Sequence, residues 1–538
     1  MKRLSFLLVN ALMLMPLTLS AQVAISPYKG HTLERCSDQK EIQVDHSYQF
    51  DNDWSGIQNI SPDGENFIVW YKKHKLSDVG QYISYESATG RELFHEKKVE
   101  SRNFIPIEKG LLSLGLDNIK LINPKTGEVL WEKDEFYEKP FFLHDNMLLT
   151  LGKLPNNQDK EYVFCYYVGR NRRHWALDIP HSDGISTICP IDSDNVFIVS
   201  NDLTKLNLKT GAKKTMKIKN SIVDGAGVAK GLLGALALVS LPVFTGYVVV
   251  PIYVDRVPTD GMLYKVKSDG STITDLTSNL LRDKDLFYLA DRKEVRCFDA
   301  DLNIKWSTAL PPKKAAHSHL FLQGDTLWMV SSGTGTVKGT QTSSIDDPFV
   351  AAFKASTGEQ LLLTMMGDSN DNICKVKKQD HRTLFSFKNS FKVYDFGTQQ
   401  VATYDLKEKD YQLLTDSAYV YEPRRQTFSK IDHSQGIYFV NKDGDLFQLS
   451  DQGTPEPISP ARKVYYSQGE MTDGTMALVN MLNEKEGDCW VVNPDGTSLC
   501  HVITPLTALS VRGKYLFLHS GSVFSVVSKE TMLAPVEQ

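Results

Sequence analysis

The chain has 538 residues, of which 41% are hydrophobic and 10% aromatic, so it has enough apolar material for a large folded core. Its 65 acidic and 60 basic residues give a formal net charge of −5, and the basic residues form no block. This balance removes the electrostatic basis of nucleic-acid binding, and no nucleic-acid partner is expected.

The first residues have the order of a secretory signal peptide. Lys2 and Arg3 precede an apolar run over 4–19, and Ser20-Ala21 then supplies small residues at the exit. We predict cleavage after Ala21 and a mature chain of 22–538. No cysteine follows the apolar run until Cys36, so a lipoprotein anchor is not expected. The predicted location is the periplasm, either free or associated with the outer membrane, and the sequence leaves a periplasmic and an extracellular position both open.

A turn signature returns along the chain at intervals of about forty residues. Its clearest copy runs from Ile122 to Trp131: an apolar alternating run, an Asn-Pro-Lys-Thr-Gly turn, and a second apolar run. Glycine supplies the positive φ that closes such a turn. The other copies are Ser87–Gly90, Tyr167–Gly169, Lys209–Gly211, Ser268–Gly270, Asp299–Asn303, Ser356–Gly358, Phe396-Gly397, Asp451–Gly453 and Pro494–Gly496.

Each turn lies between strand-like runs, and a further strand lies upstream, which gives at least three strands per repeat. The pattern predicts an all-β fold, a single β-propeller of about eight four-stranded blades or up to ten. Because a ring of repeats can include many residues in one domain, the length of the chain does not require a second domain. Ten turns leave three alternatives open: a ring larger than eight, hairpins that are not full blades, or two joined rings.

The segment Gly225–Val254 is the most unusual one, because it carries no charge from Gly231 onward. A membrane-spanning helix is not expected, since it would place the blades before and after it on opposite sides of a bilayer. Pro242 would also interrupt such a helix. We predict an apolar insertion at 225–246, helical over 227–241, followed by a blade strand over 247–254.

Small residues recur every four positions in this insertion, which lets another surface approach closely. An uncharged helix must bury most of its faces, either on its own propeller or against a partner protein or a bilayer surface over 226–244. The candidate interaction residues are Gly227, Gly231, Leu232, Ala235, Leu236, Leu238, Leu241 and Phe244.

A second insertion is predicted at 331–348, where glycine, serine and threonine dominate. Long loops on propeller faces often carry binding sites, and others are only flexible connections. Its charged groups, Lys338, Asp346 and Asp347, complete the candidate interaction residues.

The seven cysteines leave one pairing open. Cys489 and Cys500 flank the turn Asn493–Gly496. A bulged type I turn would pair Cys500 with Trp490 and turn the two thiols to opposite faces, whereas a four-residue loop would align them for a disulfide. The bulged turn is the favoured alternative.

Signals for catalysis are weak. His317 and His319 would share one face of a strand and could bind a metal, but no third ligand is recognisable nearby. Asp443-Gly-Asp445 lacks the further ligands of a calcium loop and is typical of a hairpin turn. The chain also contains no Gly-x-Ser-x-Gly and no His-Glu-x-x-His motif. No catalytic residue, metal ligand or cofactor is therefore predicted.

The repeats resemble the PQQ-like β-propeller repeat of the quinoprotein-dehydrogenase-like superfamily, with its Tyr-x-Leu-Asp-x-x-Thr-Gly-x-x-x-Trp theme. Asn123–Trp131, Asp299–Trp306 and Phe353–Gly358 carry it best. That family includes quinone-dependent dehydrogenases, which use adjacent cysteines and a calcium ion, and non-catalytic propellers such as an accessory lipoprotein of outer-membrane barrel assembly. This chain has no adjacent cysteines, so the resemblance favours the non-catalytic branch.

Together these features predict an exported, non-catalytic propeller that binds or scaffolds an envelope protein. The alternative is a propeller enzyme, either a quinone-dependent oxidoreductase or a glycan-active enzyme, with its site in the central channel.

Overall fold

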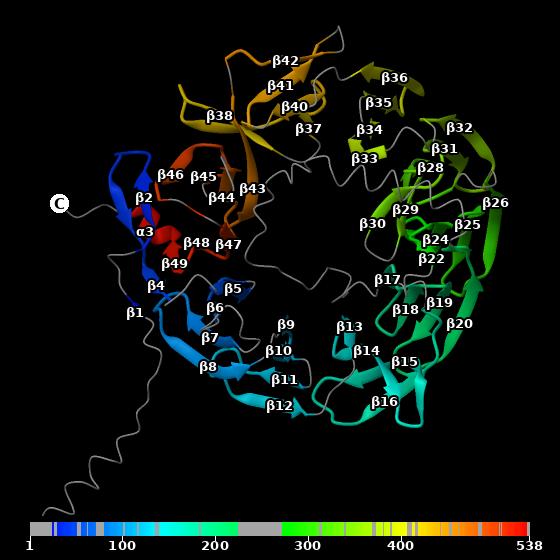
Figure 1. Ribbon diagram of the computed structural model, residues 1–538, viewed down its shortest axis with the longest axis horizontal. Helices are drawn as coiled ribbons and strands as arrows, with labels where there is room; N and C mark the ends of the chain where they lie inside the picture. Colours follow the sequence, from blue (N-terminus) through cyan, green and yellow to red (C-terminus); the bar gives the residue numbers. More distant parts are fainter. Residues whose placement is uncertain are drawn as a thin grey trace, which may run out of the picture.

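Figure 1 shows the chain as a computed structural model. The structure describes residues 24–25, 30–50, 55–61, 63–71, 80–99, 103–115, 118–134, 139–181, 184–223, 272–310, 315–337, 341–367, 373–379, 381–387, 390–405, 411–414, 418–441, 443–450, 454–460, 462–481, 487–504, 506 and 508–534. The predicted signal peptide, 1–21, and the predicted apolar insertion, 225–246, lie outside these residues.

The described secondary structure is almost entirely antiparallel β-sheet, and α3 (Lys529–Leu533) is the one helix within it. Six sheets each contain four strands that follow one another along the chain. Their strands are β5 (Ser55–Ile60), β6 (Asn66–Tyr71), β7 (Gly80–Glu86) and β8 (Glu92–Val99); β9 (Asn103–Ile107), β10 (Gly110–Leu114), β11 (Ile119–Ile122) and β12 (Val129–Lys133); β13 (Lys139–His144), β14 (Met147–Leu154), β15 (Asn157–Tyr167) and β16 (Arg173–Leu177); β17 (Thr187–Pro190), β18 (Asn195–Val199), β19 (Asp202–Asn207) and β20 (Lys213–Lys217); β23 (Leu281–Asp283), β24 (Leu286–Ala290), β25 (Glu294–Asp299) and β26 (Ile304–Ala309); and β33 (Ile373–Gln379), β34 (Arg382–Phe387), β35 (Ser390–Asp395) and β36 (Gln400–Asp405).

Two further four-stranded sheets have the same order with a hairpin inserted between their strands. They are β27 (Ser318–Gln323), β28 (Thr326–Ser331), β31 (Phe349–Lys354) and β32 (Gln360–Met365), which contain the insertion β29 (Thr334–Val337) and β30 (Gln341–Ser344); and β37 (Tyr411–Leu413), β40 (Tyr438–Asn441), β41 (Leu446–Leu449) and β42 (Pro455–Pro457), which contain the insertion β38 (Tyr419–Glu422) and β39 (Thr427–Lys430).

The last two large sheets combine both ends of the chain. An eight-stranded sheet has the order β3-β2-β46-β45-β44-β43-β38-β39, and a five-stranded sheet has the order β1-β4-β49-β48-β47. Their remaining strands are β1 (Ala24–Ile25), β2 (Thr32–Arg35), β3 (Glu41–Gln43), β4 (His46–Gln49), β43 (Val464–Glu470), β44 (Met476–Met481), β45 (Gly487–Val492), β46 (Ser498–Val502), β47 (Ala508–Arg512), β48 (Tyr515–Ser520) and β49 (Val523–Ser528). Residues 46–49 therefore complete a sheet whose other long strands come from residues 508–528.

Figure 1 shows the sheets following one another around a common centre, with the fourth strands β8, β12, β16, β20, β26 and β32 on the outside. Neighbouring sheets share apolar clusters. Phe197 meets Phe287 of the next sheet at a ring-centroid distance of 5.0 Å, and Phe67 meets Phe517, from the far end of the chain, at 5.4 Å. This arrangement of small antiparallel sheets, packed face to face in chain order, is that of a β-propeller.

Of the predicted repeat turns, Ser268–Gly270 and Asp451–Gly453 lie outside the described residues, and those that the structure describes lie between the third and fourth strands of their sheets. Gly90, Gly127, Gly211 and Gly358 all have positive φ there, as the sequence predicts. In the copy Phe396-Gly397 the prediction was wrong about the residue, because Gln399 takes the positive φ of +57°. A β-bulge accompanies most of these turns, for example between Leu121 and Ile122.

These turns also join neighbouring sheets through an aromatic side chain. Gly211 lies under the ring of Trp175, and Gly358 lies under the ring of Trp306. The indole Nε1 atoms of the two tryptophans donate to the carbonyl oxygens of Leu208 (2.8 Å) and Ala355 (2.9 Å). Glycine is therefore required at these turns for two reasons. Its backbone takes a positive φ, and a Cβ atom would collide with the aromatic ring that covers it.

We expect Gly127→Ala to destabilise the protein by about 2 kcal/mol, because φ is +72° and an added Cβ would lie 2.3 Å from Cβ of Phe94. The matched control is Gly169→Ala, where φ is +90° but nothing lies within 4 Å of the added Cβ, and about 1 kcal/mol is expected. Urea denaturation of both variants checks this. Equal losses would show that the contact with the preceding sheet contributes nothing.

The pairing of β45 with β46 corrects the predicted register of the two cysteines. Cys500 lies opposite Val491, not Trp490, because the register shifts between Val491 and Val492. The extra residue turns both thiols to the same face, where they belong to one apolar cluster as free cysteines. Burial raises the pKa of the Cys500 thiol to about 12, so it behaves as a small apolar side chain.

Candidate functional site

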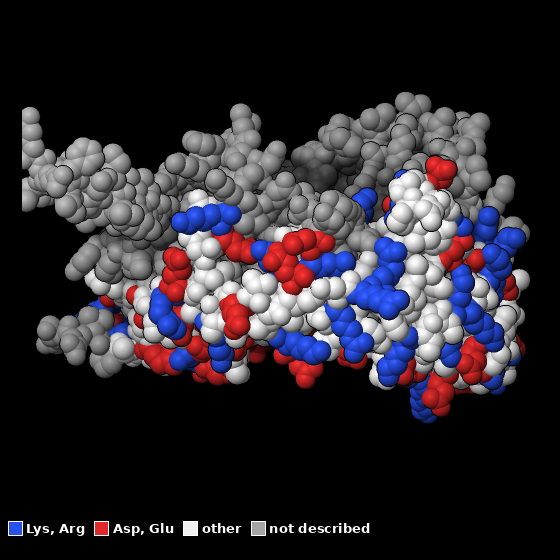
Figure 2. All heavy atoms as spheres, turned by 90° about the horizontal axis from the view of Figure 1, so that it is seen from below, with Lys and Arg blue, Asp and Glu red and all other residues white. Residues whose placement is uncertain are grey.

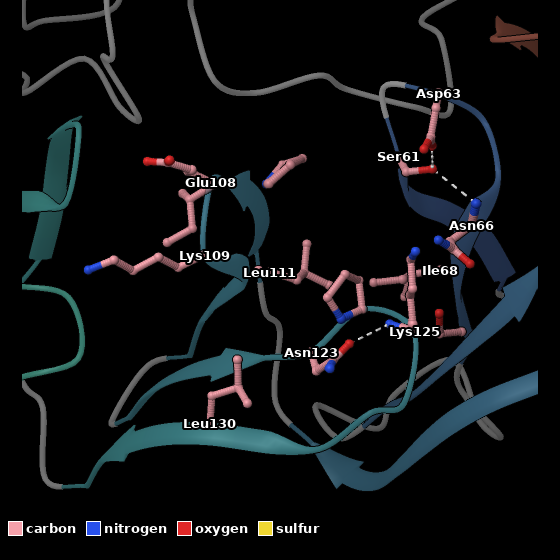
Figure 3. Close-up of a pocket in the computed structure, with 15 residues that line it drawn as sticks. Ser61, Asp63, Asn66, Ile68, Glu108, Lys109, Leu111, Asn123, Lys125 and Leu130 are labelled. Atoms are coloured by element: carbon pink, nitrogen blue, oxygen red, sulfur yellow. Dashed lines mark hydrogen bonds between the residues drawn. The ribbon is translucent and has the colours of Figure 1, made fainter.

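The candidate site is a pocket of about 490 Å³ between the sheet β5–β8 and the sheet β9–β12. Three turns form its wall: β5–β6, β9–β10, and the repeat turn β11–β12. Figure 3 shows Glu108 and Lys109 on one side and Ser61 and Asp63 on the other, with Leu111 between them. Its volume lies within the range of typical small-ligand pockets, roughly 300–1,000 Å³.

Side chains hold the β5–β6 turn in shape. The Ser61 hydroxyl donates to Oδ1 of Asp63 (2.5 Å) and accepts from the backbone N of Asn66 (2.9 Å). Oδ1 of Asp63 also accepts from the backbone N of Glu65 (3.1 Å). The Asp63 carboxylate is therefore partly occupied by its own turn, and its exposed position still leaves room for a ligand donor.

The repeat turn of β11–β12 contributes the third wall. Oδ1 of Asn123 accepts from the backbone N of Lys125 (3.0 Å), and the carbonyl oxygen of Asn123 accepts from the N of Gly127 (2.8 Å). This is the hydrogen bonding expected of an Asx turn. The residues that make the repeat recognisable in the sequence therefore also shape the pocket.

The pocket combines an apolar floor with a charged rim. Ile68 and Leu111 are buried, and Pro106, Ile107 and Leu130 add further apolar surface. Glu108, Lys109 and Lys125 are exposed, and none of them makes a salt bridge within the described part of the chain. Such a pocket suits an extended, amphipathic ligand, since its apolar part and its charges can both be matched.

The pocket and the predicted interaction residues do not coincide. The predicted residues from Gly227 to Phe244, and Lys338, lie outside the described residues. Asp346 is buried and forms a bidentate ion pair with the guanidinium of Arg292, whose side chain is 12% exposed. Asp347 is partly buried beside it.

Strands on either side of 224–271, the range that contains the first predicted insertion and lies outside the described residues, form one small sheet with strands of the second insertion. This sheet contains β21 (Ile222–Val223), β22 (Thr272–Thr274), β29 and β30. Ile222 pairs with Ile273, and Ile273 pairs with Val337. Residues 334–337 and 341–344 therefore form a hairpin, not an open loop. Because β21 and β22 are paired, the chain before residue 224 and the chain after residue 271 lie side by side.

A polar and aromatic cluster on β43, β45 and β46 gave no sequence signal. Asp488 accepts hydrogen bonds from the Tyr465 hydroxyl (2.5 Å), His501 Nε2 (2.8 Å) and Trp490 Nε1 (3.0 Å). The His501 ring stacks on Trp490 at 4.2 Å. These hydrogen bonds lower the pKa of Asp488 against the opposing effect of burial. With three donors around it, the carboxylate holds side chains from three strands together.

The other weak chemical signals fall in structural positions. Oδ1 of Asn441 accepts from the backbone N of Asp443 and of Asp445, so this segment is the β40–β41 hairpin turn. The His319 ring stacks on Phe321, and burial lowers its pKa. No group of three or more metal-ligating side chains occurs among the residues that the structure describes. Within those residues there is also no helix with the length and apolarity needed to cross a membrane.

Among solved structures, the chain is similar to BamB from Moraxella catarrhalis, with 11% identity over 90% of this chain and 99% of that chain and a TM-score of 0.32. AztD from Citrobacter koseri has 8% identity over 71% of this chain and 94% of that chain, with a TM-score of 0.30. The dihydro-heme d1 dehydrogenase NirN has 8% identity over 76% and 72%, with the same TM-score.

No protein-family model matches the chain, and no curated protein matches it. Because the identities and TM-scores of the solved structures are low, the propeller assignment rests on the sheets, turns and clusters of this chain.

Proposed function

We propose that the chain is an exported, non-catalytic propeller that binds or scaffolds a protein of the cell envelope. The observation that carries the proposal is the pocket at 61–68, 106–111 and 123–130, where an apolar floor is ringed by exposed charges. A rigid propeller face presents such turns at fixed positions, which lowers the entropic cost of binding. Export is supported by the signal-peptide pattern of residues 1–21.

The proposal includes a single closed ring of ten blades. Besides the six simple sheets, the ring would use the sheets of β27 and β37, strands β43–β46, and β47–β49 with β4. The pairing of β4 with β49 and the contact of Phe67 with Phe517 support closure between the two ends of the chain. A closed ring that leaves only short strand edges at its rim would give the rigidity that a scaffold needs.

The apolar insertion at 225–246 is proposed as a second docking element, for the same partner or for a bilayer surface. Its support is the paired stem, β21 and β22, which returns the chain to the point where it left the sheet. The uncharged run from Gly231 to Val254 would emerge from this stem. An anchor of this kind requires no lipid modification, in agreement with the position of Cys36.

The proposal is tested by crosslinking cells that express the tagged chain, purifying it from the envelope and identifying what is bound. We expect the variant Lys109→Glu/Lys125→Glu to lose at least tenfold of the captured partner, because both lysines are exposed on the pocket rim and the fold does not depend on them. Lys153→Glu, an exposed lysine outside the pocket, is the matched control.

A variant without residues 226–245 separates the two docking elements. If this variant loses the partner and Lys109→Glu/Lys125→Glu keeps it, the insertion and not the pocket is the binding site. Recovery of no partner by the unaltered chain would overturn the proposed function.

A further inference from the structure

The floor of the pocket contains a buried hydroxyl group beside its apolar side chains. Ser84 of β7 pairs with Ile68 of β6, so the two side chains lie on the same face of their sheet, and both residues line the pocket. Ser84 is 2% exposed, and its hydroxyl has no hydrogen-bond partner within the part of the chain that the structure describes. Because an unpaired buried hydroxyl costs free energy, a ligand that supplies its partner is favoured.

Side-chain amides on two walls of the pocket add further hydrogen-bonding groups. Asn66 bonds the β5–β6 turn through its backbone, and Asn123 uses its Oδ1 atom in the repeat turn. Among the described residues, the side-chain amide of Asn66 and the Nδ2 group of Asn123 have no partner. An extended peptide offers backbone N–H and C=O groups along its length, so it can bond groups on both walls.

The apolar surface continues from the pocket onto the outer strand β12. Leu130 lines the pocket and is 47% exposed, and Val129 next to it is 44% exposed. A β-bulge lies here, because Ile122 pairs with Val129 and Leu121 pairs with Trp131, which leaves Leu130 without a pairing residue on β11. The path from the buried floor over the rim to the outer strand suits an extended chain better than a compact ligand.

The two walls along this path carry opposite charges. Asp63 belongs to the β5–β6 turn and Lys125 to the repeat turn, and Figure 3 shows Asp63 across the pocket from Leu130. Both are exposed, and neither forms an ion pair within the described ranges. Glu108 and Lys109 are neighbours in the third turn, so their charges largely offset each other. A ligand with a basic group near one wall and an acidic group near the other matches the pocket.

The surrounding rim does not favour a partner of one charge sign. Figure 2 shows Lys, Arg, Asp and Glu interspersed over the rim that is seen from below in Figure 1. The formal net charge of −5 is also small for 538 residues. Long-range attraction of a strongly charged partner is therefore not supported, and recognition depends on the local charges of the pocket.

We propose that the pocket binds an extended segment of a partner protein in which a basic, an apolar, an acidic and a second apolar residue follow one another. Alternate side chains of an extended chain point to opposite sides, so the two apolar side chains cover Ile68 and Leu130 while the charged ones reach Asp63 and Lys125. A backbone group of the segment bonds the Ser84 hydroxyl. This inference rests on the proposed function and names the class of segment that its pocket recognises.

The test measures binding of a labelled peptide, Thr-Lys-Val-Glu-Val-Thr with blocked ends, and of the same sequence in reverse order, to the full chain by fluorescence anisotropy. We expect one of the two orders to bind, and Ser84→Ala to weaken its binding about fivefold, as the loss of one hydrogen bond implies. Ser510→Ala is the matched control, because Ser510 is 3% exposed on β47 and lies outside the pocket, and unchanged binding is expected.

The two ion pairs are tested by changing the protein and the peptide together. Lys125→Gln should weaken binding about threefold, and a peptide with glutamine in place of glutamate should then show no further loss, because both changes remove the same ion pair. Asp63→Asn should behave in the same way with a peptide that has glutamine in place of lysine. Its amide oxygen can keep the hydrogen bonds that Oδ1 of Asp63 accepts in the turn.

Four results would overturn the proposal. They are the absence of binding by both peptides, equal losses in the two serine variants, additive losses from the protein and peptide changes, and equally tight binding of the blocked dipeptide Val-Glu, which would assign the pocket to a small ligand. The proposed function is judged separately, by capture of an envelope partner. A captured partner that Lys109→Glu/Lys125→Glu loses leaves that function standing even if neither peptide binds, and only the class of segment is then wrong.

Discussion

Replacing Asp346 with alanine is expected to lower the free energy of unfolding by about 3–5 kcal/mol, the cost of leaving one charge of a buried ion pair without its partner. The carboxylate of Asp346 contacts both Nη atoms of Arg292, and the two side chains are only 6% and 12% exposed. Arg292 also donates to the carbonyl oxygen of Ala315 (3.2 Å). The pair therefore joins the β24–β25 turn to the inserted hairpin, and urea denaturation measures its contribution.

The control for this variant is Asp301→Ala. Asp301 pairs with Lys205 at 2.6 Å, but its side chain is 71% exposed, so a loss below about 1 kcal/mol is expected. The double variant Arg292→Met/Asp346→Leu should recover most of the loss, because it removes both charges from the same buried space. Equal stability of Asp346→Ala and Asp301→Ala, with loss of the envelope partner in the first, would instead support the interaction role that the sequence predicts for Asp346.

The fold class could be predicted from sequence because its signal is local. The turn Asn123–Gly127 depends only on its own asparagine, threonine and glycine, and similar turn residues recur in the other repeats. The sequence pattern does not identify Trp175, although its ring covers Gly211 in the same way as the ring of Trp306 covers Gly358. Two extra residues after Gly169 shift it out of the expected spacing.

Register and site could not be predicted in the same way, because they depend on pairs of distant residues. The register shift between Val491 and Val492 moves the Cys500 side chain to the opposite face of the sheet from the one predicted. No residue type in the sequence indicates where this shift occurs. The pocket is assembled from three turns that span 61–130, and each turn alone resembles an ordinary surface turn. In the sequence, Asp346 looks like an exposed carboxylate of a loop, because its ion-pair partner, Arg292, lies 54 residues earlier in the chain.

The contact between the two ends of the chain is expected to weaken in acid through His31. Its side chain is 5% exposed, Nδ1 lies 2.9 Å from the Ser525 hydroxyl, and Nε2 lies 3.0 Å from the Ser520 hydroxyl. Burial and the neighbouring His519 lower the pKa of His31 to about 4 from 6.5. The unfolded chain therefore takes up the proton first as the pH falls. Stability from this group is complete above pH 6.5 and is lost progressively down to pH 4, by about 3 kcal/mol in total.

The variant His31→Gln removes the pH dependence of stability that comes from His31. Glutamine can form hydrogen bonds with the same two hydroxyls, but it does not titrate in this pH range. Urea denaturation between pH 7.5 and pH 4 should show a steeper loss of stability in the unaltered chain, by up to about 1.4 kcal/mol per pH unit. The carboxylates are the same in both proteins, so the difference between the two curves reports His31 together with its coupling to His519. Parallel curves would mean that the His31 ring is accessible to protons in the folded protein. In that case the strand β4 would be held to β49 by its backbone pairing and the Tyr48 and Phe524 side chains without help from the residues before it.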